Sequence, residues 1–374
     1  MNTPELRDRC ARELEARAAE VPRLTAFVGL DGFVDEILHV VDKRTDAETF
    51  TRLATIAKMG QRISAAAGQS TNMELVSVMT KLGGNGPIMA NALAGFGLRV
   101  TYLGNLGYPT MHPVFADFAK KADVHTIAQP GFTDAYEFED GKLMLGKNQY
   151  LKDVNWPNII ERFGQARLAQ HLATASLVGF VNWTMLSHMS DIWAHVQEEI
   201  CPALDGSRRT LFVDLADPEK RTPQDIRRAL DLVAGFGKWF DVILGLNEKE
   251  AVEIGTVLGI PAHDRSPDGL RDLARRILEL VPVSTLVVHP TALALAASGD
   301  AVSLVEGPYV ARPRITTGAG DHFNSGFCLG RLLGLEDESC LLCGVTTSGF
   351  YVRTAASPTV ADLVGMMREW PGAE

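Results

Sequence analysis

The sequence is poor in cysteine, has no block of basic residues and contains no long uninterrupted apolar run. Five cysteines in 374 residues are an odd and scattered set, so no disulfide framework is expected and a reducing, cytoplasmic environment fits best. The formal charge of −10 comes without any cluster of Lys and Arg, which argues against a nucleic-acid partner. Charged residues alternate with Leu and Ala at helical spacing in residues 1–21, which predicts an amphipathic helix rather than a signal peptide or membrane span.

Apolar runs and amphipathic runs alternate along the rest of the chain, whose length is sufficient for one large domain covering residues 1–374. Strands are expected at residues 24–30, 99–107, 176–183, 210–216, 241–246 and 284–289. Helical periodicity is found at residues 86–97, 110–121, 188–200, 223–236, 247–258 and 268–281. This order predicts an α/β fold with a central, mainly parallel sheet and helices on both of its faces.

Two regions depart from this alternation. Residues 131–150 alternate on either side of Asp140-Gly141, which predicts a hairpin outside the main sheet. Residues 36–80 are longer than a simple connection requires and include an extra helical segment near 47–66. Within the hairpin, "GKLMLGKN" nearly matches the phosphate-binding P-loop motif, but Asn148 occupies the position where Ser or Thr should bind magnesium. The segment is therefore assigned to the hairpin and not to a P-loop.

The stretch "TTGAGD" at residues 316–321 precedes a helix predicted to begin near Ala319. The free amides of a first helical turn attract anions, and Gly318 and Gly320 would let a phosphate approach the backbone closely. Asp321 then has two interpretations: an acid that only favours the helix dipole, or a general base beside a bound phosphoryl group. The two glycines favour the second, because an acid serving only the dipole does not need them.

The stretch "GLNEKE" places Asn247 and Glu250 three residues apart, in the first turn of a helix that follows a strand. This spacing matches a capping box, in which the two side chains satisfy backbone N–H groups. It also suits a pair of oxygen ligands that hold Mg²⁺ through its bound water molecules near nucleotide phosphates. Both interpretations can hold together.

Polar residues also follow the first strand and precede the helix at residue 86. Asp31 and Asp35 lie just past the strand, and Gly84 and Asn85 open the helix. Carboxylates and amides in such places suit the hydroxyl groups of a sugar or another polyol. Each feature taken singly is equally explained as ordinary turn chemistry.

Together these stretches resemble the PfkB (ribokinase-like) family of carbohydrate and nucleoside kinases. The order agrees over most of the chain: an acid after the first strand, a double glycine with Asn85, "NEKE" for the family's N-x-x-E, and "TTGAGD" for its D-T-x-G-A-G-D. The resemblance implies a ribokinase-like three-layer fold with a small β lid, here formed by segments near 36–42 and 131–147.

The resemblance also implies a function: transfer of the γ-phosphate of ATP to a hydroxyl of a sugar or sugar-like molecule, with Mg²⁺ as cofactor. Asp321 would be the general base, and Gly318, Ala319 and Gly320 would form the anion hole. The acceptor would contact Asp31, Asp35, Gly84 and Asn85, while the nucleotide and its metal would be held by Asn247, Glu250, Thr317, Gly318 and Gly320. An exposed face of the lid could support a homodimer.

Three departures from the family pattern point to an altered acceptor or nucleotide site. Ile315 replaces the first Asp of D-T-x-G-A-G-D, which argues against a K⁺ site, and Ile88 replaces a sugar-contacting Asn. Residues 287–295 lack the family's Thr and Gly nucleotide pattern. A catalytically silent sugar- or nucleotide-binding protein and a nucleoside kinase are therefore kept as alternatives. A dinucleotide-dependent oxidoreductase is disfavoured, because no strand leads into G-x-G-x-x-G.

Some features are left without a functional role. Cys340 and Cys343 have the spacing of half a metal or redox motif, but no second pair completes it, so core packing is expected. His322 directly follows the expected base, and no role is predicted for it.

Overall fold

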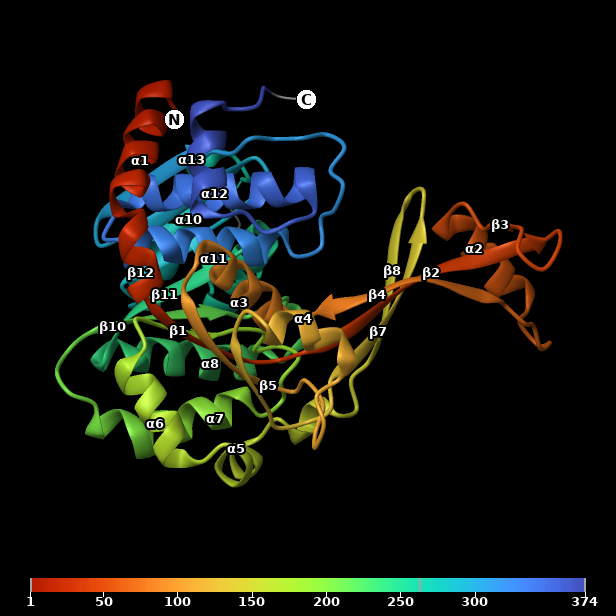
Figure 1. Cartoon of the computed structure of the whole chain (residues 1–374), viewed down its shortest axis with the longest axis horizontal. Coiled ribbons are helices and arrows are strands. Elements are labelled where there is room, and N and C mark those ends of the chain that lie inside the picture. The colour runs from red at the N-terminus through yellow and green to blue at the C-terminus, as the bar shows by residue number, and fades with distance from the viewer. Residues whose placement is uncertain (1, 262–263, 373–374) are drawn as a thin grey trace.

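A large twisted sheet forms the centre of the molecule (Figure 1) in a computed structural model that describes residues 2–261 and 264–372. Within these ranges nine strands lie in the order β14-β13-β12-β11-β10-β9-β1-β5-β6, and the pairs from β12 to β6 are all parallel. The bounds are β1 (Thr25–Leu30), β5 (Arg99–Gly104), β6 (Asp123–Thr126), β9 (Leu177–Phe180), β10 (Arg209–Asp214), β11 (Phe240–Leu246), β12 (Thr285–Val288), β13 (Leu293–Ser298) and β14 (Ala301–Glu306). The predicted α/β class and mainly parallel central sheet are confirmed.

The six strands expected from apolar runs are present, but the sheet has further strands that were not predicted. β13 and β14 form an antiparallel hairpin at one edge, joined at Gly299-Asp300. Their sequences are short and rich in alanine and serine, which have little intrinsic preference for strands, so the pattern is weak. β6, at the opposite edge, has only four residues.

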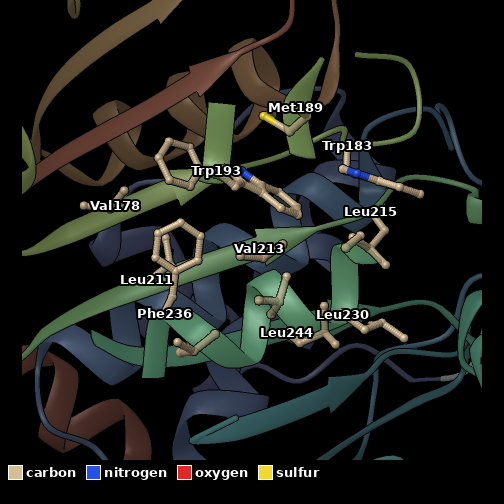
Figure 2. Packing of buried hydrophobic residues seen from close by; sticks show 14 of the residues in the cluster. Val178, Trp183, Met189, Trp193, Leu211, Val213, Leu215, Leu230, Phe236 and Leu244 are labelled. Atoms are coloured by element: carbon tan, nitrogen blue, oxygen red, sulfur yellow. The ribbon is translucent and has the colours of Figure 1, made fainter. Parts of the chain in front are cut away.

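Helices cover both faces of the sheet. One face carries α5 (Trp156–Arg162), α6 (Gln165–Thr174), α7 (Met189–His195), α8 (Pro223–Gly235), α9 (Glu248–Leu258) and α10 (Pro267–Leu280). The other carries α1 (Pro4–Arg17), α3 (Asn85–Phe96), α4 (Ala116–Ala119), α11 (Ala319–Leu332), α12 (Asp337–Thr354) and α13 (Val360–Arg368). Figure 2 shows the first core, where Trp193 and Phe236 pack against strand residues such as Leu211.

A second, smaller sheet projects away from the main body (Figure 1). In the described residues its five strands are β2 (Phe33–Arg44), β3 (Phe50–Arg52), β4 (Leu75–Gly83), β7 (Gly131–Phe138) and β8 (Gly141–Lys147). The predicted hairpin around Asp140-Gly141 is confirmed as β7 and β8. Of the extra helical segment predicted near 47–66, the structure forms a helix only at α2 (Ile56–Ala65), preceded by β3.

The helix α2 gives the small sheet a core of its own. Six buried side chains form this cluster: Leu38, Val40, Leu53, Met59, Tyr136 and Phe138. Asp140, in the turn of the hairpin, accepts a hydrogen bond from the backbone N–H of Ile56 at 2.8 Å, which ties the start of α2 to the tip of β7 and β8.

The predicted helix over 110–121 is wrong in its extent, since only Pro113–Ala119 is helical and its first turn is a 3₁₀ turn. The proline at 113 disfavours helical backbone at His112, so the helix cannot begin earlier. Cys340 and Cys343 pack in the core as expected, and all five cysteines are buried and free. No helix in the described part of the chain is both long and apolar enough to cross a membrane.

Candidate active site

A cavity of about 380 Å³ lies where the small sheet meets the carboxyl ends of the central strands. Ligands gather at this edge of an open parallel sheet because loops and helix N-termini converge there. Seven of the side chains or glycines predicted for the site line this cavity: Asp35, Gly84, Asn85, Glu250, Thr317, Gly318 and Asp321. Residues that are far apart in sequence are therefore brought to one place.

A second cavity, also of about 380 Å³, lies on the other side of the Gly318–Gly320 turn. Asn247, Ala319 and Gly320 line it. The rest of its wall is mostly apolar or aromatic and includes Pro290 and Tyr309. A largely apolar cleft with a few polar groups at one end is suited to a ligand with a flat ring and a polar tail.

The turn between the two cavities has the conformation of an anion site. Helix α11 begins at Ala319 as predicted, and Gly318 has φ 93°, a value that side-chain-bearing residues rarely adopt. The N–H groups of Gly318 and Gly320 have no acceptor among the described residues, whereas the N–H of Ala319 donates to the carbonyl of Thr316 at 3.1 Å. Two of the three predicted anion-hole amides are thus free for a ligand.

Asp321 follows this turn in the first turn of α11 and is 7 % exposed. Its Oδ1 accepts a hydrogen bond from Nδ2 of Asn85 at 3.0 Å. Burial raises the pKa of Asp321 from 3.8 to about 8; the Asn85 hydrogen bond opposes this shift, and the charges of Asp31 and Glu250 add to it. A carboxyl group with this pKa gives up and accepts protons near neutrality, which suits a general base.

Asp31 is fully buried and does not line the cavity. Its carboxylate accepts hydrogen bonds from the N–H groups of Asn85 and Gly86 at 3.0 and 2.8 Å, and from Nδ2 of Asn182 at 2.7 Å. Burial raises the pKa of Asp31 to about 6. The residue binds the N-terminus of α3, and in this way it fixes the position of Asn85.

Asp35 lies on β2 with its carboxyl group in the cavity wall. Lys81 on β4 and Thr133 on β7 are its direct neighbours across the small sheet. Burial raises the pKa of Asp35, while Lys81 and the Thr133 hydroxyl oppose the shift. Gly83 is required beside it, because a Cβ at that position would lie 2.4 Å from the carboxyl group.

Asn247 and Glu250 form the predicted capping box at the start of α9. The two oxygens of Glu250 each accept one hydrogen bond of 2.8 Å, from the N–H of Asn247 and from the N–H of Asp217. Each carboxylate oxygen has a second lone pair, so metal-bound water molecules can still donate to it. Burial raises the pKa of Glu250, as expected for a carboxylate held in a poorly solvated place.

Several site residues were not predicted from the sequence, although each lies at the end of a central strand or in the loop that follows it. Asn182 and Lys220 line the first cavity, and His289 lines the second. Asp214, the last residue of β10, accepts hydrogen bonds from Asn324 at 2.9 Å and from the N–H of Ala216 at 2.8 Å. Burial, with the charges of Glu250 and Asp321, raises the pKa of Asp214 well above its ordinary value. The only signal for them in the sequence was a position at or after the end of a predicted strand, which ordinary turn residues share.

His322, left without a predicted role, supports the turn. One ring nitrogen is hydrogen-bonded to the carbonyl of Gly318 at 2.8 Å and the other to the hydroxyl of Ser357 at 2.9 Å. The ring stacks on Tyr351 with centroids 3.6 Å apart. Burial lowers the pKa of His322 to about 4, so the ring is neutral near neutral pH and contributes no charge.

Solved structures with the same fold include sugar and nucleoside kinases. A ribokinase from Arabidopsis thaliana in complex with ribose and ATP superimposes with a TM-score of 0.63 at 16 % identity, over 92 % of this chain and 98 % of that chain. An adenosine kinase from Sinorhizobium meliloti superimposes with a TM-score of 0.59 at 18 % identity, over 92 % and 98 % of the two chains.

Sequence comparisons are more specific than these structural ones. A ketohexokinase from Haloferax volcanii is 29 % identical over 358 residues, which is 95 % of this chain and 93 % of the relative. The family model for prokaryotic ketohexokinase matches residues 2–370. The chain belongs to the prokaryotic ketohexokinase family and is a carbohydrate kinase of the PfkB (ribokinase-like) type.

Proposed function

We propose that this protein transfers the γ-phosphate of ATP to a hydroxyl group of a ketohexose. The observation that carries this proposal is the position of Asp321, whose carboxyl group lines one cavity directly after the glycine turn that separates it from a second. A phosphoryl transfer needs the acceptor and the nucleotide on opposite sides of one anion site. The family match and the Haloferax volcanii relative support a ketohexose as the acceptor.

The first cavity would hold the sugar. Asp35 supplies a strong acceptor for sugar hydroxyl groups, and Asn85 and Asn182 add amide groups that donate and accept. Asp321 would accept the proton from the attacking hydroxyl, and the Asn85 hydrogen bond holds its carboxyl group in place. Asp31 takes part indirectly, by binding the backbone at which α3 begins.

The second cavity would hold the nucleotide, with its terminal phosphate at the free N–H groups of Gly318 and Gly320. Asn247 and Glu250 would hold Mg²⁺ through water, and the oxygen donors present fit that ion. Burial raises the pKa of Asp214, Glu250 and Asp321, so the site contains three acidic side chains whose ionised forms are poorly solvated. The bound ion supplies positive charge that neutralises the nucleotide phosphates.

A product screen tests the proposal. The protein is incubated with Mg·ATP and separate acceptors: D-fructose and other ketohexoses, aldohexoses, ribose and adenosine, with sugar phosphates measured by mass spectrometry and ADP by a coupled assay. Phosphorylation of ketohexoses in preference to the rest is expected. Preferred phosphorylation of adenosine would instead identify a nucleoside kinase, and ligand binding without product from any acceptor would identify a silent binding protein.

The substitution Asp321→Asn tests the assignment of the base. The amide has nearly the same shape but cannot accept the proton, so kcat should fall by about 10² to 10⁴ while ATP binding is retained. An unchanged kcat would contradict the role of Asp321 without affecting the choice of acceptor.

A further inference from the structure

The first cavity is rich in acidic side chains. Four carboxyl groups line it, from Asp35, Asp217, Glu250 and Asp321, whereas Lys220 is the only lysine or arginine among the described residues in its wall. Lys220 ends a short 3₁₀ turn after β10, and its side chain is 56 % exposed. A phosphoryl group entering this cavity would meet acidic groups in several parts of the wall, so a positively charged side chain there is of particular importance.

Asp217 has two lysine partners. Nζ of Lys220 lies 2.9 Å from its Oδ2, and Nζ of Lys249 lies 2.7 Å from its Oδ1. Lys249 also contacts Glu219 at 2.6 Å and does not line the cavity. If Lys220 moves away, Asp217 therefore keeps a cationic partner and is not left as an unpaired charge.

The position of Asp217 itself does not depend on Lys220. Its backbone is held in the left-handed region at φ 63°, and its N–H donates to Oε1 of Glu250 at 2.8 Å. Lys220, in contrast, has a flexible four-carbon stem and an ammonium group with three rotatable donors. The ion pair between Lys220 and Asp217 can thus break while the loop keeps its shape.

We infer that Lys220 is a further catalytic residue, whose ammonium group leaves Asp217 and binds oxygen atoms of the transferring γ-phosphoryl group. Lys220 and Gly318 line the same cavity. Lys220 would therefore approach a phosphoryl group bound at the free amides of the glycine turn from a different part of the cavity wall. This inference rests on the proposed kinase function. It assigns to one side chain the positive charge that phosphoryl transfer requires in addition to the metal ion.

The test compares nucleotides with and without the γ-phosphate. The affinity of the 374-residue protein for Mg·ADP and for Mg·AMP-PCP, a non-hydrolysable ATP analogue, is measured by isothermal titration calorimetry. For Lys220→Met the affinity for Mg·AMP-PCP should fall by about 10- to 100-fold, as expected for loss of a charge-assisted hydrogen bond, while that for Mg·ADP changes less than about threefold. Lys220→Arg, which keeps the charge, should restore most of the affinity for Mg·AMP-PCP.

Lys120→Met is the matched control. Lys120 forms the same i, i+3 ion pair with Asp117 at 2.7 Å, but it lies on the surface and lines neither cavity. This variant should bind both nucleotides as the parent protein does. Equal weakening of both nucleotides by Lys220→Met, or no weakening of either, would overturn the assignment.

The outcomes also separate this inference from the proposed function. A parent protein that binds Mg·AMP-PCP but phosphorylates no ketohexose would contradict the proposed acceptor, while the nucleotide comparison would still decide the role of Lys220. A parent protein that binds neither nucleotide would overturn both.

Discussion

Asp321→Asn should make the folded protein more stable as well as less active, and the gain in stability should depend on pH. Burial raises the pKa of Asp321 from 3.8 to about 8 in the folded chain, so between these values the folded state holds this proton more tightly than the unfolded state does. The free energy of unfolding of the parent protein therefore falls as pH rises through this window. The asparagine variant has no proton at this position and lacks that decline.

The magnitude follows from the shift in pKa. One pKa unit corresponds to about 1.4 kcal/mol, so the full shift from 3.8 to about 8 sets an upper limit of roughly 5 to 6 kcal/mol on the destabilisation by the ionised carboxylate. The decline begins near pH 4 and levels off above the folded-state pKa of about 8, so roughly half of it falls between pH 6 and pH 9. The stability advantage of the variant should grow by roughly 2 to 3 kcal/mol between pH 6 and pH 9.

Urea unfolding of both proteins, followed by circular dichroism at several pH values from 6 to 9, measures this advantage. Asp117→Asn is a suitable control, because that exposed carboxyl group pairs with Lys120 and its pKa is lowered, so it stays ionised throughout this range. A constant difference between Asp321→Asn and the parent protein from pH 6 to pH 9 would refute the reasoning. It would mean that burial does not disfavour the ionised form of the Asp321 carboxyl group.

Three further outcomes are expected. In the parent protein kcat/KM should rise with pH through about 8, because the base must be unprotonated; a flat profile between pH 6 and 9 would contradict this. In Asn85→Ala the hydrogen bond that favours the Asp321 carboxylate is lost, so the rise of kcat/KM should move to higher pH and kcat/KM at pH 7 should fall about tenfold. An unchanged pH profile would count against a role for the hydrogen bond between Asn85 and Asp321. In Gly83→Ala the new Cβ should displace the Asp35 carboxyl group and lower kcat/KM for the sugar by about 10- to 100-fold, while the affinity for Mg·ADP is retained. Steady-state kinetics measures kcat/KM, and calorimetry measures the affinity for Mg·ADP.

Local patterns predicted those parts of the site that depend on a single segment. The start of α11 at Ala319 and the capping box of Asn247 and Glu250 were both expected, because caps and glycine turns depend on residues close in sequence. The choice between Asp31 and Asp35 was not predictable in this way. It depends on the pairing of β2 with β4 and β7, which places Asp35 in the cavity wall, whereas Asp31 meets the first turn of α3.

Local patterns also did not identify the site residues on the loops after the central strands. Asn182 and Lys220 follow strands that were predicted, but nothing in their own segments distinguishes them from ordinary turn residues. Their importance comes from neighbours contributed by other strands and helices. The antiparallel hairpin of β13 and β14 was missed for a different reason, since β13 is alanine-rich and has no β-branched or aromatic residue, and only Val302 and Val305 of β14 are typical of strands.

The separate core of the small sheet has a consequence for how such a kinase can change in evolution. The six buried residues of that core belong to neither of the two clusters that hold the main body together. A substitution that loosens or reshapes the small sheet would therefore alter the wall that carries Asp35 at little cost to the stability of the nucleotide side. Preference for a new sugar can thus be acquired stepwise, by changes in and around β2, β7 and α2, while the machinery that binds and transfers phosphate is left intact.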